Sequence, residues 1–147
     1  MSAYRRILVA VDGSAASMKG LREALRLAKA DGAQVFIVHV VNEFYAFANL
    51  DGFAPSADIV TSLREGGRRV LAKAKAVADK EGIRAKTLMR ETPGGAAADL
   101  IVREARKQRA ALIVLGTHGL RRAVLGSDAE QVVRRSSVPV LLVRAAN

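Results

Sequence analysis

The regular alternation of two hydrophobic patterns is the feature that most constrains how this chain can fold. Four of its five short runs of β-branched residues are almost continuously apolar, which is typical of strands covered on both faces. A half-exposed antiparallel strand would instead alternate apolar and polar residues. The pattern therefore predicts a mostly parallel sheet. The five predicted strands cover residues 7–11, 35–41, 85–90, 112–115 and 138–143.

Four stretches with helical spacing separate these runs. Ser14 is the predicted N-cap of the first, and Gly32 is the residue expected to terminate it. The fourth opens on Ser127 and Glu130, which form a capping-box pattern. The predicted helices run from about residue 14 to 31, from about 56 to just before 82, from about 95 to 108, and from 127 to just before Pro139.

The second predicted helix contains an adjacent pair of glycines, Gly66 and Gly67, in its middle. A glycine inside a helix costs about 1 kcal/mol relative to alanine, so we expect close packing or a local irregularity there. The buried stripe of this helix is expected to consist of Ile59, Leu63, Val70, Ala74 and Val77.

Strands and helices alternate from end to end, and crossovers between parallel strands are right-handed. The economical arrangement is therefore a doubly wound α/β fold, a five-stranded parallel sheet with two helices on each face. The length of 147 residues is that of one ordinary domain, so we expect a single domain over residues 1–147.

Composition narrows the classes of function. The absence of cysteine excludes disulfides, thiolate nucleophiles and Cys-based metal sites, and it fits a reducing cytoplasm. The two histidines, His39 and His118, lack the spacing of a metal site, and no G-x-S-x-G elbow is present. The first apolar run is too short for a signal peptide or a membrane span. We therefore expect a cytoplasmic binding protein without a metal site.

The net charge of +10 predicts an anionic partner, such as a nucleotide, a nucleic acid or an anionic lipid surface. Residues 101–147 hold nine Lys or Arg against three Asp or Glu, a surplus of +6. The basic residues are not interleaved with aromatics, so nucleic acid is the less favoured partner. We expect the positive charge to surround a nucleotide crevice.

Ligands of open parallel sheets bind beyond the carboxyl ends of the strands. Asp12 directly follows the first predicted strand, and a glycine-rich segment, residues 116–119, follows the fourth. Glycines and helix N-termini suit phosphate groups, although neither a P-loop nor a dinucleotide fingerprint occurs. Structural alternatives remain open: Asp12 could accept hydrogen bonds from its own turn, and His118 could be an exposed loop residue. Ser127 could serve as an N-cap alone, and His39 is expected to be a packing residue.

These motifs resemble the universal stress protein family, whose members carry G-x-x-G, nine residues and then G-[ST] after the fourth strand. Residues 7–14 are similar to the family's opening strand, and residues 126–143 are similar to its closing helix and strand. The resemblance covers the whole chain. It implies a Rossmann-like fold similar to the adenine nucleotide alpha hydrolases, with strand order 3-2-1-4-5, and a homodimer paired through residues 138–144.

In one subgroup of the family, the resemblance also implies bound ATP, with or without Mg²⁺; AMP and ADP are alternatives. The base would face the residues after two strands, and the ribose and phosphates would face the glycine-rich loop and the last helix. The residues that would face the base are Ala10, Val11, Asp12 and Val40. Those that would face the ribose and phosphates are Gly116, His118, Gly119, Gly126 and Ser127.

This chain departs from the family pattern in one place. Only six residues separate Gly119 from Gly126, and Arg121 and Arg122 among them either contact phosphate or are solvated. We expect a nucleotide-binding stress protein that signals to an unknown protein partner rather than an enzyme, with slow ATP hydrolysis left open. The alternative is a nucleotide-free dimeric module of the same fold.

One segment has no helical or strand pattern. Residues 42–55 contain four of the six aromatic residues of the chain. These rings either pack over the second helix or form a lid over a ligand or partner surface.

Overall fold

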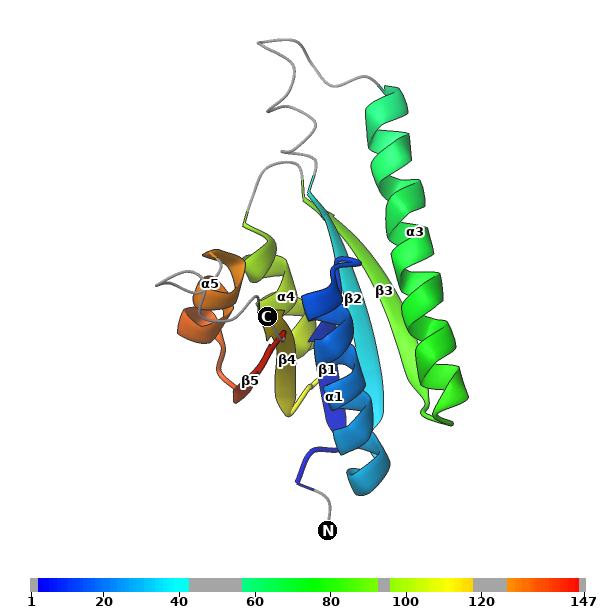
Figure 1. Ribbon diagram of the computed structural model, residues 1–147. Coiled ribbons are helices and arrows are strands. Elements are labelled where there is room, and N and C mark those ends of the chain that lie inside the picture. The colour runs from blue at the N-terminus through cyan, green and yellow to red at the C-terminus, as the bar shows by residue number, and fades with distance from the viewer. Residues whose placement is uncertain (1–2, 43–56, 93–95, 118–126, 146–147) are drawn as a thin grey trace.

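A computed structural model describes residues 3–42, 57–92, 96–117 and 127–145 of the chain. Within these ranges strands and helices alternate (Figure 1). The aromatic segment of the sequence analysis lies, after Asn42, outside the described residues. The elements are β1 (Arg6–Ala10), α1 (Ala15–Asp31), β2 (Gln34–Asn42), α3 (Ala57–Lys80), β3 (Ala85–Thr92), α4 (Ala97–Lys107), β4 (Leu112–Thr117), α5 (Ser127–Arg135) and β5 (Val140–Arg144).

The five strands form one sheet in the order β3-β2-β1-β4-β5, and every neighbouring pair is parallel. This confirms the predicted fold class and strand order. In the centre of the sheet Ile7 pairs with Val35 on one side and with Leu112 on the other. No described helix has the length and apolar character needed to cross a bilayer.

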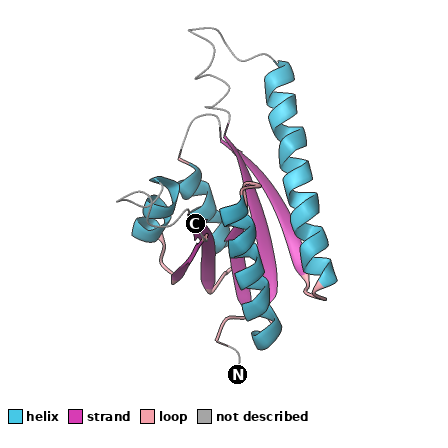
Figure 2. Cartoon of the chain, in the orientation of Figure 1, coloured by secondary structure: helices cyan, strands magenta, loops and turns pink. Residues whose placement is uncertain are grey.

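Helices cover both faces of the sheet, α1 and α3 on one and α4 and α5 on the other (Figure 2). Successive residues of β1 serve the two faces in turn: Ile7 and Val9 join the core under α1 and α3, and Leu8 joins the core under α4 and α5. All three are fully buried, and each contributes roughly 1.5–3 kcal/mol to stability. Burial on both faces explains why residues 7–10 of β1 are continuously apolar.

The ends of α1 are those that the sequence predicts. Ser14 accepts a hydrogen bond on Oγ from the N–H of Ser17 at 3.1 Å, which satisfies one free donor of the first turn. Gly32 follows the helix in the left-handed conformation, with φ of 67°. At the start of α5 the carboxylate of Glu130 accepts from Arg134 one turn further along. The side chain of Ser127 lies outside the described residues, so the capping box stays a prediction.

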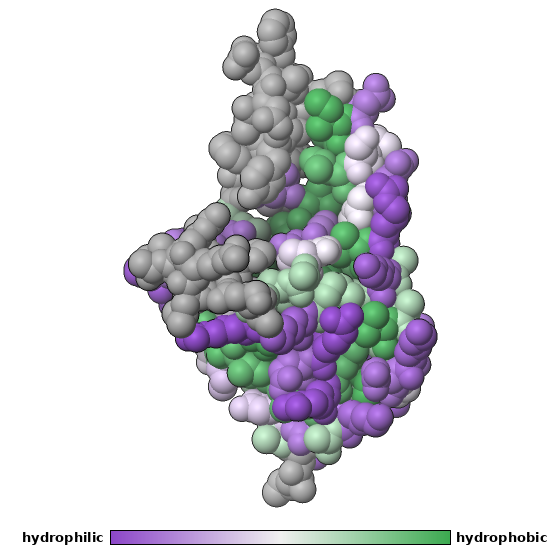
Figure 3. Space-filling view, viewed as in Figure 1, coloured by the Kyte–Doolittle hydropathy of each residue, from purple (hydrophilic) through white to green (hydrophobic). Residues whose placement is uncertain are grey.

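The predicted buried stripe of α3 is confirmed in part. Ala74 is fully buried as predicted, and the other four predicted residues are half-buried: Ile59, Leu63, Val70 and Val77. The prediction lacked three buried residues, Gly67, Leu71 and Ala78. Ile59 and Leu63 lie in the first half of α3, which extends past the end of the sheet, whereas Val70 and Val77 lie in the second half and pack against the core under α1 and α3 (Figure 1). Figure 3 shows hydrophobic residues on the side of α3 toward the sheet and hydrophilic residues on its outer side.

Close packing at the glycine pair of α3 is confirmed for Gly67. A Cβ atom added there would lie 2.8 Å from Cδ2 of His39 and 3.0 Å from the sulfur of Met89. Gly66 has open space, because a Cβ atom there would meet only the end of Arg69 at 4.0 Å. The two adjacent glycines therefore have different structural requirements.

The end of α4 carries a residue that no sequence signal indicated. Arg109 has φ of 55°, and the following Ala110 donates its N–H to the carbonyl of Ala105 at 2.8 Å. Glycine is the usual residue at such a position, since a side chain in the left-handed region costs about 1–2 kcal/mol.

Replacing Arg109 by glycine is expected to stabilise the protein by about 0.5–1 kcal/mol, because the backbone strain is removed at some cost in unfolded-state entropy. Urea denaturation followed by circular dichroism measures the change. Arg109→Ala is the control, since it removes the guanidinium and keeps Cβ. A gain in Arg109→Ala equal to that in Arg109→Gly would attribute the effect to charge instead of backbone.

Candidate functional site

A cavity of about 230 Å³ opens at the carboxyl ends of β1, β2 and β4. Its walls come from these strands and from the N-terminal parts of α1, α4 and α5. The sheet order reverses direction between β1 and β4, so the cavity lies at the switch point of the doubly wound fold.

Five residues of the predicted site line this cavity: Ala10, Val11, Asp12, Val40 and Gly116. They lie in or directly after three strands, β1, β2 and β4, that are separated in the sequence. The other predicted residues, His118, Gly119 and Gly126, lie outside the described residues, as do Arg121, Arg122 and the side chain of Ser127.

The helices supply lining residues that the sequence analysis did not identify. Ala97 and Ile101 come from α4, and Asp128, Ala129 and Val132 come from α5. These positions are in the first two turns of helices that follow strands. The rule that predicted Asp12 indicates them too when it is extended from strand ends to helix starts.

The turn after β1 is held by a closed set of hydrogen bonds. Asp12 accepts on Oδ1 from the N–H of Ser14 at 2.9 Å. Ser17, which is 6% exposed, accepts on Oγ from the N–H of Asp12 at 3.2 Å and donates to the carbonyl of Ser14 at 3.1 Å. The Asp12 carboxylate thus accepts a bond from its own turn and also lines the cavity.

Gly116 has a structural role beside its place in the cavity. A Cβ atom added to it would lie 1.9 Å from the carbonyl oxygen of Ala16, and one added to Gly20 would lie 2.9 Å from the backbone nitrogen of Gly116. The first turns of α1 therefore rest directly on the backbone of β4. This packing alone requires glycine at position 116.

The described lining of the cavity is acidic. Among the described residues its lining contains two carboxylates, Asp12 and Asp128, and no Lys or Arg. Much of the basic surplus lies on the outer face of α4, where Arg103, Arg106 and Lys107 are exposed. Helical periodicity turns these side chains away from the sheet, so they do not line the cavity. The expected positive field around the crevice stays a prediction.

The lining of the cavity suits a ligand with a flat apolar part and a polar edge. Val38, Val40, Ile101 and Val132 provide apolar walls, and Asp12 provides hydrogen-bond acceptors at the mouth. The small side chains at the cavity, such as Ala10 and Ala97, leave the space open. The described residues contain no group of three or more His, Asp or Glu side chains that could hold a metal ion.

Comparison with known proteins gives a consistent result. A family model described as "Universal stress protein family" matches residues 3–144. The universal stress protein MJ0531 of Methanocaldococcus jannaschii is 36% identical over 144 residues, which cover 96% of this chain and 82% of the relative.

Solved structures agree with the sequence comparison. A protein from the universal stress protein family of Burkholderia pseudomallei matches with a TM-score of 0.81 and 36% identity, over 99% of each chain. The universal stress protein from Archaeoglobus fulgidus in complex with dAMP matches with a TM-score of 0.70 and 27% identity, over 97% of this chain and 99% of that one.

Proposed function

Because the chain belongs to the universal stress protein family, we propose that it binds an adenine nucleotide in the cavity at the carboxyl ends of β1, β2 and β4. The observation that carries this proposal is the convergence of Ala10, Val11, Asp12, Val40 and Gly116 on one cavity. The similar structure from Archaeoglobus fulgidus in complex with dAMP supports the choice of ligand.

In this proposal the base enters between the apolar walls of the cavity, which remove its faces from water. Asp12 accepts hydrogen bonds from the donors on the base. The phosphates extend toward Gly116 and the start of α5, where the first N–H groups of a helix favour negative charge. The loop of residues 118–126, with His118, Gly119, Gly126 and the hydroxyl of Ser127, would complete the contacts to ribose and phosphate.

The charge of the lining bears on which nucleotide binds. Asp12 and Asp128 would repel a free triphosphate, since no Lys or Arg lies among the described lining residues. We therefore propose that ATP binds together with Mg²⁺, which lowers its negative charge, and that AMP and ADP bind without this requirement. The protein would act by binding and by presenting a changed surface to a protein partner in the stress response.

The sheet edge at β5 is the proposed site of homodimer formation. β5 pairs only with β4 in the described chain, so the outer backbone groups of Val140–Arg144 face away from the sheet. An open edge with an apolar sequence is a ready surface for pairing with a second copy. Dimerisation there would leave the cavity free.

The experiment that tests the nucleotide site is calorimetric titration of the purified chain with AMP, ADP and ATP, each with and without Mg²⁺. The test variant is Ala97→Phe, because Ala97 is half-buried and lines the cavity. A phenyl ring there fills the space for the base, so we expect binding to weaken by about tenfold or more.

Ala72→Phe is the matched control for this test, since Ala72 is exposed on α3 and away from the cavity. It should bind as the unchanged protein does. If the unchanged protein binds no adenine nucleotide, the nucleotide-free module is the better description. Equal binding by Ala97→Phe and Ala72→Phe would place the ligand elsewhere.

A further inference from the structure

One peptide group beneath the cavity is held from both sides by different elements. The carbonyl oxygen of Val11 lies 2.8 Å from Nδ1 of His39 on β2. The N–H of Asp12 donates to Oγ of Ser17 on α1 at 3.2 Å. Because this carbonyl and this N–H belong to the same planar group, the two hydrogen bonds together fix its orientation.

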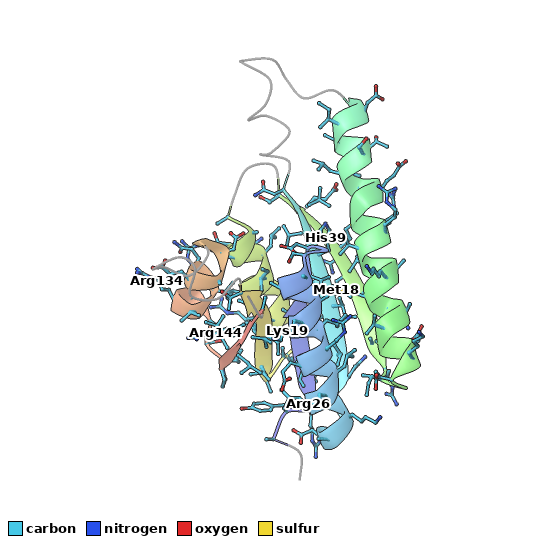
Figure 4. The ribbon with its side chains drawn as sticks, in the orientation of Figure 1. Met18, Lys19, Arg26, His39, Arg134 and Arg144 are labelled. Atoms are coloured by element: carbon cyan, nitrogen blue, oxygen red, sulfur yellow. The ribbon has the colours of Figure 1, made fainter. Side chains whose placement is uncertain are left out.

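His39 approaches this peptide from the face of the sheet opposite α4 and α5. Figure 4 shows it on β2, between the N-terminal end of α1 and the helix α3. It is not among the residues that line the cavity. Since a carbonyl oxygen can only accept, Nδ1 of His39 carries the proton of this hydrogen bond, which sets the tautomer of the neutral ring.

The position of the His39 ring is restricted by α3. A Cβ atom at Gly67 would lie 2.8 Å from Cδ2 and 3.2 Å from Nε2 of the ring, and it would also press on Met89. The ring therefore fills the space that the missing side chain of Gly67 leaves. Any shift of the ring moves the donor that holds Val11.

The Val11–Asp12 peptide decides where the Asp12 carboxylate points. Val11 is 3% exposed, and its own N–H donates to the carbonyl of Val38 at 2.9 Å. The carbonyl of Val11 accepts from His39. Without this donor the carbonyl, a buried acceptor, would turn toward another hydrogen-bond donor. Asp12 would then leave its place beside Ser14 and Ser17 at the mouth of the cavity.

We propose that His39 is a positioning residue of the ligand site: through the Val11–Asp12 peptide it orients the Asp12 carboxylate toward the ligand without touching the ligand itself. The proposal rests on the nucleotide function proposed above. Ser17 holds the same peptide from α1, and Gly67 of α3 makes room for the ring. The helix α3 is thereby coupled to a cavity that it does not line.

A pair of substitutions separates this role from simple packing. His39→Leu keeps most of the volume and removes the donor, whereas His39→Asn removes volume and keeps an N–H at the position of Nδ1. We expect AMP binding to weaken by about tenfold in His39→Leu, the effect of losing one hydrogen bond, and to stay within about threefold in His39→Asn. The opposite order, or equal effects, would overturn the proposal.

A second readout does not depend on a ligand. Hydrogen exchange of the Asp12 amide, measured by NMR, reports whether the peptide keeps its bond to Ser17. We expect exchange to quicken by about tenfold in His39→Leu and to be nearly unchanged in His39→Asn. This pattern without any AMP binding would refute the nucleotide function and leave the positioning role standing; unchanged exchange in both variants would refute the positioning role.

The neighbouring glycines of α3 provide a further test should His39→Leu not fold. Gly67→Ala pushes on the His39 ring, and Gly66→Ala meets only open space in the same helix. We expect Gly67→Ala to quicken Asp12 exchange and to weaken AMP binding, and Gly66→Ala to do neither. Identical behaviour of the two variants would contradict the proposed coupling.

Discussion

Replacing Gly116 by alanine is expected to destabilise the protein by about 3 kcal/mol or more, the upper range for overpacking a core. The added methyl group would lie 1.9 Å from the carbonyl oxygen of Ala16 and 2.8 Å from the backbone nitrogen of Ser17. These atoms belong to the first turn of α1 and cannot yield as the end of a flexible side chain can. The helix must therefore move away from β4 or the protein must unfold.

Guanidinium denaturation followed by circular dichroism measures this loss of stability. Gly20→Ala tests the same helix–strand contact from the other side and should also be destabilising, since its Cβ would lie 2.9 Å from the nitrogen of Gly116. Gly66→Ala is the control and should gain about 0.5–1 kcal/mol from higher helix propensity. A stable Gly116→Ala that lost only nucleotide binding would show that position 116 serves the ligand alone.

This packing role changes how the ligand site should be tested. A larger residue at position 116, such as valine, obstructs the phosphates in the proposed function, but it also clashes with Ala16. Loss of nucleotide binding in such a variant would not separate the two causes. Ala97→Phe is the better test, because Ala97 is half-buried, lines the cavity and takes no part in the contact between α1 and β4 at Gly116.

The fold could be predicted because its local patterns agree with its global arrangement. Continuous apolar runs such as residues 35–41 require a sheet covered on both faces, and the cores on the two sides of β2 supply that cover. Ser14 and Gly32 mark the ends of α1 by local hydrogen bonding and backbone conformation alone. The stripe of α3 is confirmed only in part, because the offset of a helix along a sheet depends on tertiary packing.

The candidate site could be predicted only where it follows from strand ends. Asp12, Val40 and Gly116 converge because the carboxyl ends of parallel strands meet at one edge of the sheet. The bond from His39 to Val11 could not be foreseen, because it depends on the register that pairs Ala10 with Val38. The outward direction of the basic residues of α4 likewise depends on which helix face meets the sheet.

The second large effect concerns an ion pair that ties the edge strand β3 to α4. Glu104 is 5% exposed and accepts from Nε of Arg90 at 2.6 Å and from Nε2 of Gln108 at 3.1 Å. Burial alone would raise the pKa of the Glu104 carboxyl, but these hydrogen bonds, with the charges of Arg90 and Lys107, hold the pKa below its ordinary value of 4.5. The charged form is therefore the one that stabilises the fold.

Glu104→Gln is expected to lower the free energy of unfolding by about 2 kcal/mol at neutral pH, through weaker bonds to Arg90. Since the pKa of Glu104 is lowered on folding, its contribution is complete above pH 4.5 and is lost as the pH falls through the folded-state value. The difference between the two proteins, measured by urea denaturation from pH 7 to pH 3, should therefore shrink toward the acid end.

Asp79→Asn is the matched control for this pH dependence, because its ion pair with Lys75 is exposed on α3. It should cost less than about 0.5 kcal/mol at any pH. A difference between Glu104→Gln and the unchanged protein that stayed constant down to pH 3 would mean that shape and packing, rather than the charge of Glu104, hold β3 to α4. If the difference in the free energy of unfolding disappears only below pH 4.5, the charged carboxylate of Glu104 is what holds β3 to α4.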